Sequence, residues 1–174
     1  MKIKKTRCII IFGLSGSGKS SISEIILKDL EKKIGKTFLI HGDALRILFK
    51  DFGYNFGYTK KERSKSILPT QKVINFLLNN GLNVLFNNVC LNKKAYNTWK
   101  KNIKNLTYVY IKTDVKKIIK FGKKNNIYKN NKNVVGVDIK PDIPRNPDIV
   151  IENNFDRPLN KIANELKYKL KKIL

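Results

Sequence analysis

The chain has 174 residues, of which 41% are hydrophobic, and its 37 Lys and Arg residues against 13 Asp and Glu give a formal net charge of +24. This length is close to that of one domain, and the hydrophobic content is sufficient for a core. No apolar run reaches the ~20 residues that cross a bilayer, and the N-terminus leads into a strand-like run without a signal-peptide cleavage site. We therefore expect one domain over residues 1–174, located in the cytoplasm and without a membrane partner.

The positive charge would ordinarily favour nucleic acid as a partner, because basic surfaces bind phosphate backbones. Here the excess is almost all lysine, with five arginines, and the lysines are spread over the whole length. We interpret this as compositional bias and expect a general attraction for anionic nucleotides. The two cysteines, Cys8 and Cys90, have neither metal-ligand spacing nor the density of a disulfide scaffold, so we expect both to be reduced and partly buried.

The first predicted elements enclose a phosphate-binding loop. Residues 7–12 form an apolar, strand-like run, and an amphipathic helical pattern covers 20–33. Between them stands Gly13-Leu14-Ser15-Gly16-Ser17-Gly18-Lys19-Ser20, a complete G-x-x-x-x-G-K-[ST] motif. In this motif backbone N–H groups surround the phosphates, the lysine reaches the β- and γ-phosphates, and the last hydroxyl ligates Mg²⁺. It predicts ATP binding by this loop and the adjoining Ser21, with Lys19 as a catalytic cation. A tight turn that binds nothing is the alternative.

The remaining elements alternate along the chain. Strand-like runs follow at 37–41, 83–87, 106–112 and 148–152, and helical patterns lie at 64–80, 93–104, 115–121 and 159–173. Such alternation is typical of a parallel sheet with helices on both faces. We therefore predict an α/β fold of the P-loop NTPase type with a five-stranded parallel sheet.

Two segments do not fit this alternation. Residues 51–61 are rich in aromatic residues and glycine and are expected to wrap a ligand. Residues 122–147 are polar and end in three prolines, Pro141, Pro144 and Pro147. A loop of this length is usually a functional lid or disordered. In a phosphotransferase a lid keeps water from the transferring group, so we expect a lid and name residues 122–147 the lid segment.

Further motifs follow the second strand. The chain reads His41-Gly42-Asp43-Ala44-Leu45-Arg46 and then Tyr58-Thr59-Lys60-Lys61-Glu62-Arg63-Ser64-Lys65-Ser66-Ile67. With the phosphate loop, and with Gly136-Val137-Asp138 followed by Pro144, Pro147 and Asp148, this order resembles the adenylylsulfate kinase family over about the first 155 residues. The resemblance implies a nucleotide-kinase-like fold, Mg²⁺ as cofactor, and transfer of the γ-phosphoryl group of ATP to the 3′-hydroxyl of adenylylsulfate.

Three charged residues acquire roles from this resemblance. Asp43 follows a parallel strand at the sheet edge where such folds hold their ligands. The matching carboxylate of the family helps to place the acceptor hydroxyl and the waters of the metal, so we assign Asp43 as general base or, with Ser20, as part of the Mg²⁺ shell. A helix N-cap is the alternative for Asp43. Arg46 and Arg63 are expected to grip the anionic 5′ side of the acceptor with their planar forks, with surface ion pairs as the alternative.

The remaining acceptor-binding candidates are Tyr58, Ser66, Val89 and Val134. The family sandwiches the adenine between two aromatic rings, and Tyr58 matches the first position while the second falls on Val134 or Val135. Stacking on one ring is worth about 1–3 kcal/mol, so its loss would weaken adenine capture by roughly 5- to 150-fold. Ser66 stands where an asparagine that contacts the acceptor is expected.

Two other positions depart from the family pattern. His41 replaces the first aspartate of an Asp-Gly-Asp triplet, and an exposed side chain there is one interpretation. We expect instead a buried side chain at the strand end. The lid segment lacks the arginine and aspartate of the family, and Lys123 or Lys124 is a candidate replacement for the lost positive charge, with solvated lysines as the alternative.

These departures leave two acceptors open. Adenylylsulfate is the first, and cytidine diphosphoramidate, on which relatives of the family act, is the second because its smaller base needs less stacking surface. A kinase of base monophosphates or polynucleotide 5′ ends, and a nucleotide-gated module that binds nucleic acid, are more remote alternatives. The expected partners are therefore ATP and a small nucleotide acceptor, and a homodimer remains open.

Overall fold

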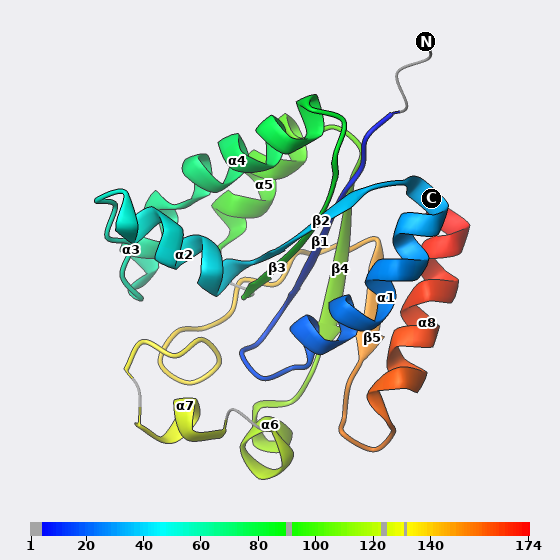
Figure 1. Ribbon diagram of the computed structural model, residues 1–174. Coiled ribbons are helices and arrows are strands. Elements are labelled where there is room, and N and C mark those ends of the chain that lie inside the picture. The colour runs from blue at the N-terminus through cyan, green and yellow to red at the C-terminus, as the bar shows by residue number, and fades with distance from the viewer. Residues whose placement is uncertain (1–4, 90–91, 123–124, 131) are drawn as a thin grey trace.

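The computed structural model describes residues 5–89, 92–122, 125–130 and 132–174, and it contains one five-stranded sheet (Figure 1). Its strands are β1 (Cys8–Gly13), β2 (Thr37–His41), β3 (Asn83–Val89), β4 (Leu106–Lys112) and β5 (Ile149–Glu152). They lie in the order β2-β3-β1-β4-β5, and every pairing between them is parallel. The predicted α/β fold with a five-stranded parallel sheet is confirmed.

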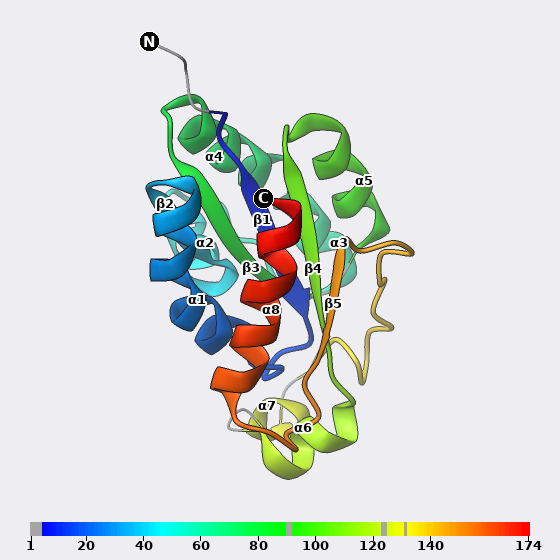
Figure 2. The same ribbon diagram turned by 90° about the vertical axis from the view of Figure 1, so that its right-hand side faces the viewer.

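Helices cover both faces of this sheet, and its central strand, β1, is therefore buried on both sides. Alternate side chains of β1 point to opposite faces, so Ile10 joins one core cluster and Ile11 the other. The first cluster packs under α2 (Gly42–Asp51), α4 (Ile67–Asn79) and α5 (Lys93–Asn102). The second packs under α1 (Lys19–Ile34) and α8 (Leu159–Ile173), which lie side by side (Figures 1 and 2). Cys8 belongs to the first cluster and is buried, as expected, whereas Cys90 lies outside the described residues.

The predicted helix over 64–80 is wrong in one respect, because the structure has two helices there. α3 (Lys60–Lys65) begins with a capping box between Thr59 and Glu62, and α4 begins after Ser66. Pro69 has no N–H with which to bond the carbonyl four residues earlier, and its ring would clash with that carbonyl. A proline is tolerated in the first turn of a helix, so a new helix starts at Ile67.

The lid segment is more ordered than a loop. It follows α6 (Val115–Phe121) and contains the short helix α7 (Asn125–Asn130), which the sequence did not predict. A third apolar cluster, named the lid cluster here, joins it to the phosphate loop and α6 and consists of Leu14, Ile118, Tyr128, Val134 and Val135. The end of the segment therefore packs directly on the phosphate loop.

In the described part of the chain, no helix combines the length and apolar character that crossing a membrane requires.

Candidate active site

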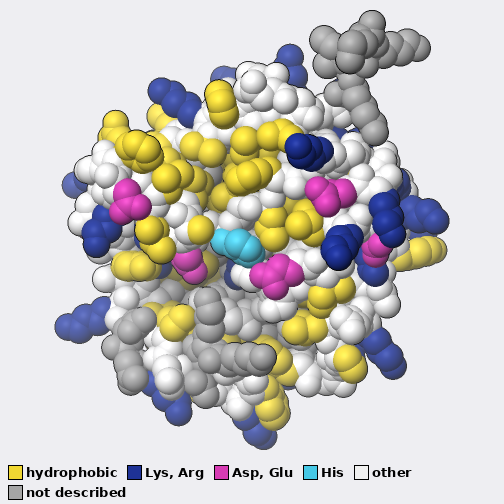
Figure 3. All heavy atoms as spheres, viewed as in Figure 1, with side chains coloured by type: hydrophobic (Ala, Val, Ile, Leu, Met, Phe, Trp, Pro, Cys, Tyr) yellow, Lys and Arg dark blue, Asp and Glu magenta, His cyan; other side chains and the backbone are white. Residues whose placement is uncertain are grey.

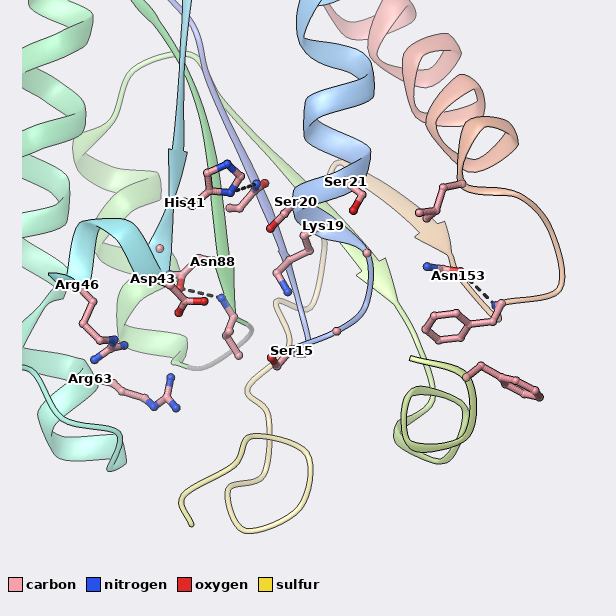
Figure 4. Close-up of a pocket in the computed structure, with 18 of the residues that line it drawn as sticks. Ser15, Lys19, Ser20, Ser21, His41, Asp43, Arg46, Arg63, Asn88 and Asn153 are labelled. Atoms are coloured by element: carbon pink, nitrogen blue, oxygen red, sulfur yellow. Dashed lines mark hydrogen bonds between the residues drawn. The ribbon is translucent and has the colours of Figure 1, made fainter. Parts of the chain in front are cut away.

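The main cavity lies at the carboxyl ends of the parallel strands and has a volume of about 390 Å³ (Figure 4). Open parallel sheets hold their ligands at this edge. The phosphate loop and the start of α1 lie in the middle of the site, with Asp43, Arg46 and Arg63 on one side and Asn153 on the other. The cavity is therefore shared by segments that are far apart in the sequence.

The phosphate loop contributes six of its predicted ligand-binding residues to the cavity lining, namely Ser15, Gly16, Gly18, Lys19, Ser20 and Ser21. The Lys19 ammonium lies between loop carbonyls and donates to the oxygens of Gly13 and Leu14 at 3.0 and 2.6 Å. The other three predicted residues support the loop from behind. Gly13 faces β4, where a Cβ would lie 2.7 Å from the carbonyl oxygen of Ile111, Leu14 belongs to the lid cluster, and Ser17 is fully buried.

Asp43 reaches the cavity because the turn from β2 into α2 passes very close to β3. A Cβ on Gly42 would lie 2.9 Å from the carbonyl oxygen of Asn87, so glycine permits this approach. Asp43 lies in the first turn of α2, while the N-cap is His41 and makes no side-chain capping bond. The alternative role of Asp43 as N-cap is therefore wrong. Its carboxylate lines the cavity at the positive end of the helix dipole, where negative charge is favoured.

Arg46 and Arg63 line the cavity and lie over the same ring. Their guanidinium carbons are 4.8 and 5.2 Å from the ring centroid of Tyr58. Arg46 donates to the carbonyl oxygens of Phe56 and Gly57, so the aromatic loop after α2 wraps this arginine. Arg63 donates through Nε to the carbonyl oxygen of Tyr58 at 2.6 Å.

Burial, and secondarily the charge of Arg46, lowers the pKa of Arg63 to about 10, against the opposing influence of Tyr58 and Asp43. Two guanidinium groups held together in a partly desolvated place form a favourable site for an anion.

The other predicted acceptor residues are placed differently. Val89 lines the cavity, whereas Tyr58, Ser66 and Val134 are not among its described lining residues. Tyr58 is 56% exposed and faces the two arginines. Ser66 donates to the carbonyl oxygen of Arg63 and lines a side cavity of about 30 Å³ next to Arg46. Val134 is 6% exposed within the lid cluster.

His41 lines the cavity and is only partly buried, so the expectation of a buried histidine is wrong. Its Nδ1 lies 3.2 Å from Nδ2 of Asn87, whose Oδ1 accepts a 2.6 Å bond from the hydroxyl of Ser23. Nε2 of His41 lies 3.9 Å from Oε1 of Glu24.

At the other end of the cavity are residues that sequence reasoning missed, Phe121, Asn153, Phe155, Arg157 and Leu159. The rings of Phe121 and Phe155 are 6.4 Å apart and tilted by 39°. The backbone of Phe155 has φ of 59°, which is unusual for a bulky side chain and often marks a functional position. Four of the five follow the last strand, so the rule that ligands bind at the carboxyl ends of parallel strands could have indicated them.

Mg²⁺ fits the oxygen donors of this cavity. Among the described residues, no group of three or more His, Cys, Asp and Glu is placed to hold a metal. Mg²⁺ is usually bound by one or two protein oxygens together with substrate phosphates and water. The hydroxyl of Ser20 and the carboxylate of Asp43 both line the cavity and supply such oxygens. The lid candidates Lys123 and Lys124 lie outside the described residues.

Comparison with known proteins gives consistent results. The family model described as adenylylsulphate kinase matches residues 5–152. A cytidine diphosphoramidate kinase of Campylobacter jejuni is 30% identical over 150 residues, which cover 84% of this chain and 85% of that protein. An adenylyl-sulfate kinase of Clostridium kluyveri is 29% identical over 170 residues, 91% of this chain and 82% of that protein.

Among solved structures, the APS kinase of Mycobacterium tuberculosis in complex with AMPPNP and APS superimposes with a TM-score of 0.79 at 23% identity. The match covers 96% of this chain and 98% of that structure. It supports the same overall fold.

Proposed function

Since this chain belongs to the adenylylsulphate kinase family, and is therefore an ATP-using phosphotransferase with an alcohol acceptor, we propose that it phosphorylates the ribose 3′-hydroxyl of a small nucleotide. The observation that carries the proposal is that Lys19 and Ser20 of α1 line the same cavity as Asp43 and Arg46 of α2. A donor phosphate and an acceptor hydroxyl can meet between these two helix starts.

On the donor side, the phosphates of ATP bind over residues 15–21, where N–H groups and the positive end of the α1 dipole favour anions. Lys19 must leave the loop carbonyls that it contacts to reach the β- and γ-phosphates. Ser20 and Asp43 would hold Mg²⁺, which neutralises charge on the phosphates when bound. The donor base extends toward Phe121 and Phe155, whose aromatic faces suit stacking.

On the acceptor side, Arg46 and Arg63 bind the anionic 5′ group, and Asp43 orients the 3′-hydroxyl and accepts its proton as the phosphoryl group transfers. Phosphoryl transfer depends mainly on positioning and on charge stabilisation, which these residues and Lys19 supply. The reaction fits the cytoplasm, where ATP is available.

Adenylylsulfate is the first candidate acceptor, and one observation favours cytidine diphosphoramidate as a second. The position that matches the second adenine-stacking ring of the family is Val134 or Val135, and both are packed in the lid cluster. A smaller pyrimidine base has less surface to stack, so it loses less stacking energy when the second aromatic ring is absent. The relatives of both kinds are almost equally similar to this chain, at 30% and 29% identity.

The proposal of a module that binds nucleic acid receives no support from the face in Figure 3, where Lys and Arg side chains are scattered, many of them near the outline, and form no single stripe. The site aromatics, Phe121 and Phe155, instead line the cavity of the phosphate loop.

The acceptor is tested by incubating the protein with ATP, Mg²⁺ and either adenylylsulfate or cytidine diphosphoramidate, and comparing kcat/KM for the two. Asp43→Asn is the control, because it preserves the shape of the side chain without its charge. Transfer to one acceptor that is lost in the control supports the proposal. ATP hydrolysis alone, with neither nucleotide phosphorylated, would contradict it.

A further inference from the structure

Two carbonyl groups of the phosphate loop accept hydrogen bonds from side chains that lie outside the loop. The loop needs its N–H groups turned toward the ligand, and in a trans peptide the C=O and the N–H of the next residue point in opposite directions. A donor that fixes one loop carbonyl therefore also fixes the direction of the following N–H.

The first such donor is Tyr128 in α7. Its hydroxyl donates a 2.6 Å hydrogen bond to the carbonyl oxygen of Ser15, and its ring is 8% exposed within the lid cluster. Burial raises the pKa of Tyr128 to about 12, so the hydroxyl remains a donor at physiological pH. The Ser15 carbonyl is thus turned toward the lid cluster, and the N–H of Gly16 is turned the other way, to the side of the cavity that Gly16 lines.

The second donor is Asn153, which follows β5 and is 1% exposed. Its Nδ2 donates to the carbonyl oxygen of Ser17 at 3.0 Å, and its Oδ1 accepts from the N–H of Phe155 at 3.2 Å. These two bonds leave one consistent orientation of the amide. The contact is close, since a Cβ on Gly18 would lie 2.9 Å from Nδ2 of Asn153. The N–H of Gly18 is thereby turned away from Asn153.

The two glycines that follow the held carbonyls have left-handed backbones, with φ of 75° at Gly16 and 92° at Gly18. Alternation of such conformations is what turns successive N–H groups into an anion-binding concavity. We infer that Tyr128 and Asn153 are positioning residues that preset this concavity for the phosphate chain of the donor, by fixing the peptide planes that precede Gly16 and Gly18. The inference rests on the proposed function, because it concerns the same phosphate site.

Tyr128→Phe tests the inference, because it removes one hydroxyl and leaves the ring in the lid cluster. Its matched control is Tyr108→Phe in β4, where a buried tyrosine hydroxyl donates at 3.0 Å to the carbonyl oxygen of Tyr96, away from the phosphate loop. Calorimetric Kd values are measured for Mg²⁺-ATP and for Mg²⁺-tripolyphosphate, which has no base or ribose. Thermal unfolding of each variant verifies that it is folded.

We expect Tyr128→Phe to raise both Kd values by the same factor, about 3- to 10-fold for one lost hydrogen bond, and Tyr108→Phe to change neither. Asn153→Asp keeps the acceptor for Phe155 but places an oxygen against the Ser17 carbonyl, and it should weaken both ligands further.

The inference is overturned if Tyr128→Phe binds both ligands with unchanged affinity, or if its affinity falls for ATP only. The proposed function still stands in that case, provided that the wild type binds ATP and phosphorylates a nucleotide. A wild type that binds neither ligand would overturn both.

Discussion

Arg46 and Arg63 both lie over the ring of one tyrosine, with guanidinium carbons 4.8 and 5.2 Å from the Tyr58 ring centroid. Arg46 comes from α2 and Arg63 from α3, and both line the cavity. Burial lowers the pKa of Arg63, and repulsion by the charge of Arg46 lowers it further, to about 10. Binding of an anionic group between them would relieve this repulsion, which is why we assign this end of the cavity to the acceptor.

Arg63→Lys should lower kcat/KM for the acceptor by about 10- to 100-fold while leaving KM for ATP nearly unchanged. Lysine keeps one positive charge but cannot present two parallel N–H groups to the anion. Steady-state kinetics with each substrate varied in turn give the two values, and Arg145→Lys, at an exposed position outside the cavity lining, is the control. An equal fall in kcat/KM for ATP would show that Arg63 binds the donor instead of the acceptor.

Asp43→Asn should reduce kcat by about 10²- to 10⁴-fold, as expected for a lost general base, and should change the Kd for ATP much less. Because Asp43 is not the N-cap of α2, the melting temperature should stay close to that of the wild type. The measurements are single-turnover rates, nucleotide titration and thermal unfolding. A destabilised variant with a normal rate would assign Asp43 a structural role only.

Phe121→Ala should raise KM for ATP by roughly 5- to 150-fold with little change in kcat, since stacking of a base is worth about 1–3 kcal/mol. Phe121 is 56% exposed, so its removal leaves the core intact. Phe38→Ala, at a ring of similar exposure on β2, is the matched control. If Phe121→Ala and Phe38→Ala have the same KM for ATP, the donor base does not lie at the end of the cavity that Phe121 lines.

The lid segment should exchange its amide hydrogens more slowly when ATP and acceptor are bound together, because a closed lid orders its backbone. In the free protein, the amides of Gly136 and Ile139 are already hydrogen-bonded to backbone carbonyls and should exchange more slowly than those of residues 142 and 143. Hydrogen–deuterium exchange with mass spectrometry measures the exchange rates of these two stretches of the lid segment separately. The same exchange rates with and without ligands would argue against a lid.

Much of the fold could be predicted from local signals. The five strands and the helices over 115–121 and 159–173 follow from hydrophobic periodicity, and the phosphate loop lies between β1 and α1 as its motif requires. The break at Ser66 was missed because residues 60–66 are all polar and carry no hydrophobic period that could mark it, although Pro69 carried the signal. α7 was missed because its residues are polar and its stability comes from packing of Tyr128 on Leu14 and its neighbours.

The candidate site was predictable only where a motif existed. Lys19, Asp43, Arg46 and Arg63 belong to recognisable runs, and all four line the cavity. Asn153 follows β5, so the rule for the carboxyl ends of parallel strands could have indicated it as a lining residue. Its contact with Ser17, 136 residues away in the chain, has no local pattern. Ser66 and Val134 were chosen by family position, and their packing beside the cavity depends on the path of the α3–α4 junction and of the lid segment.

The position of the transferred phosphoryl group tests the proposed 3′-kinase activity directly. The protein is incubated with Mg²⁺, ATP labelled at the γ-phosphate and the preferred nucleotide acceptor, and the product is examined by ³¹P NMR beside a reaction with the 3′-deoxy acceptor. We expect one new phosphomonoester, with the labelled phosphoryl group on the ribose 3′-oxygen, and no transfer to the 3′-deoxy analogue. Phosphorylation at another atom, or equal transfer to the 3′-deoxy analogue, would contradict the proposed activity.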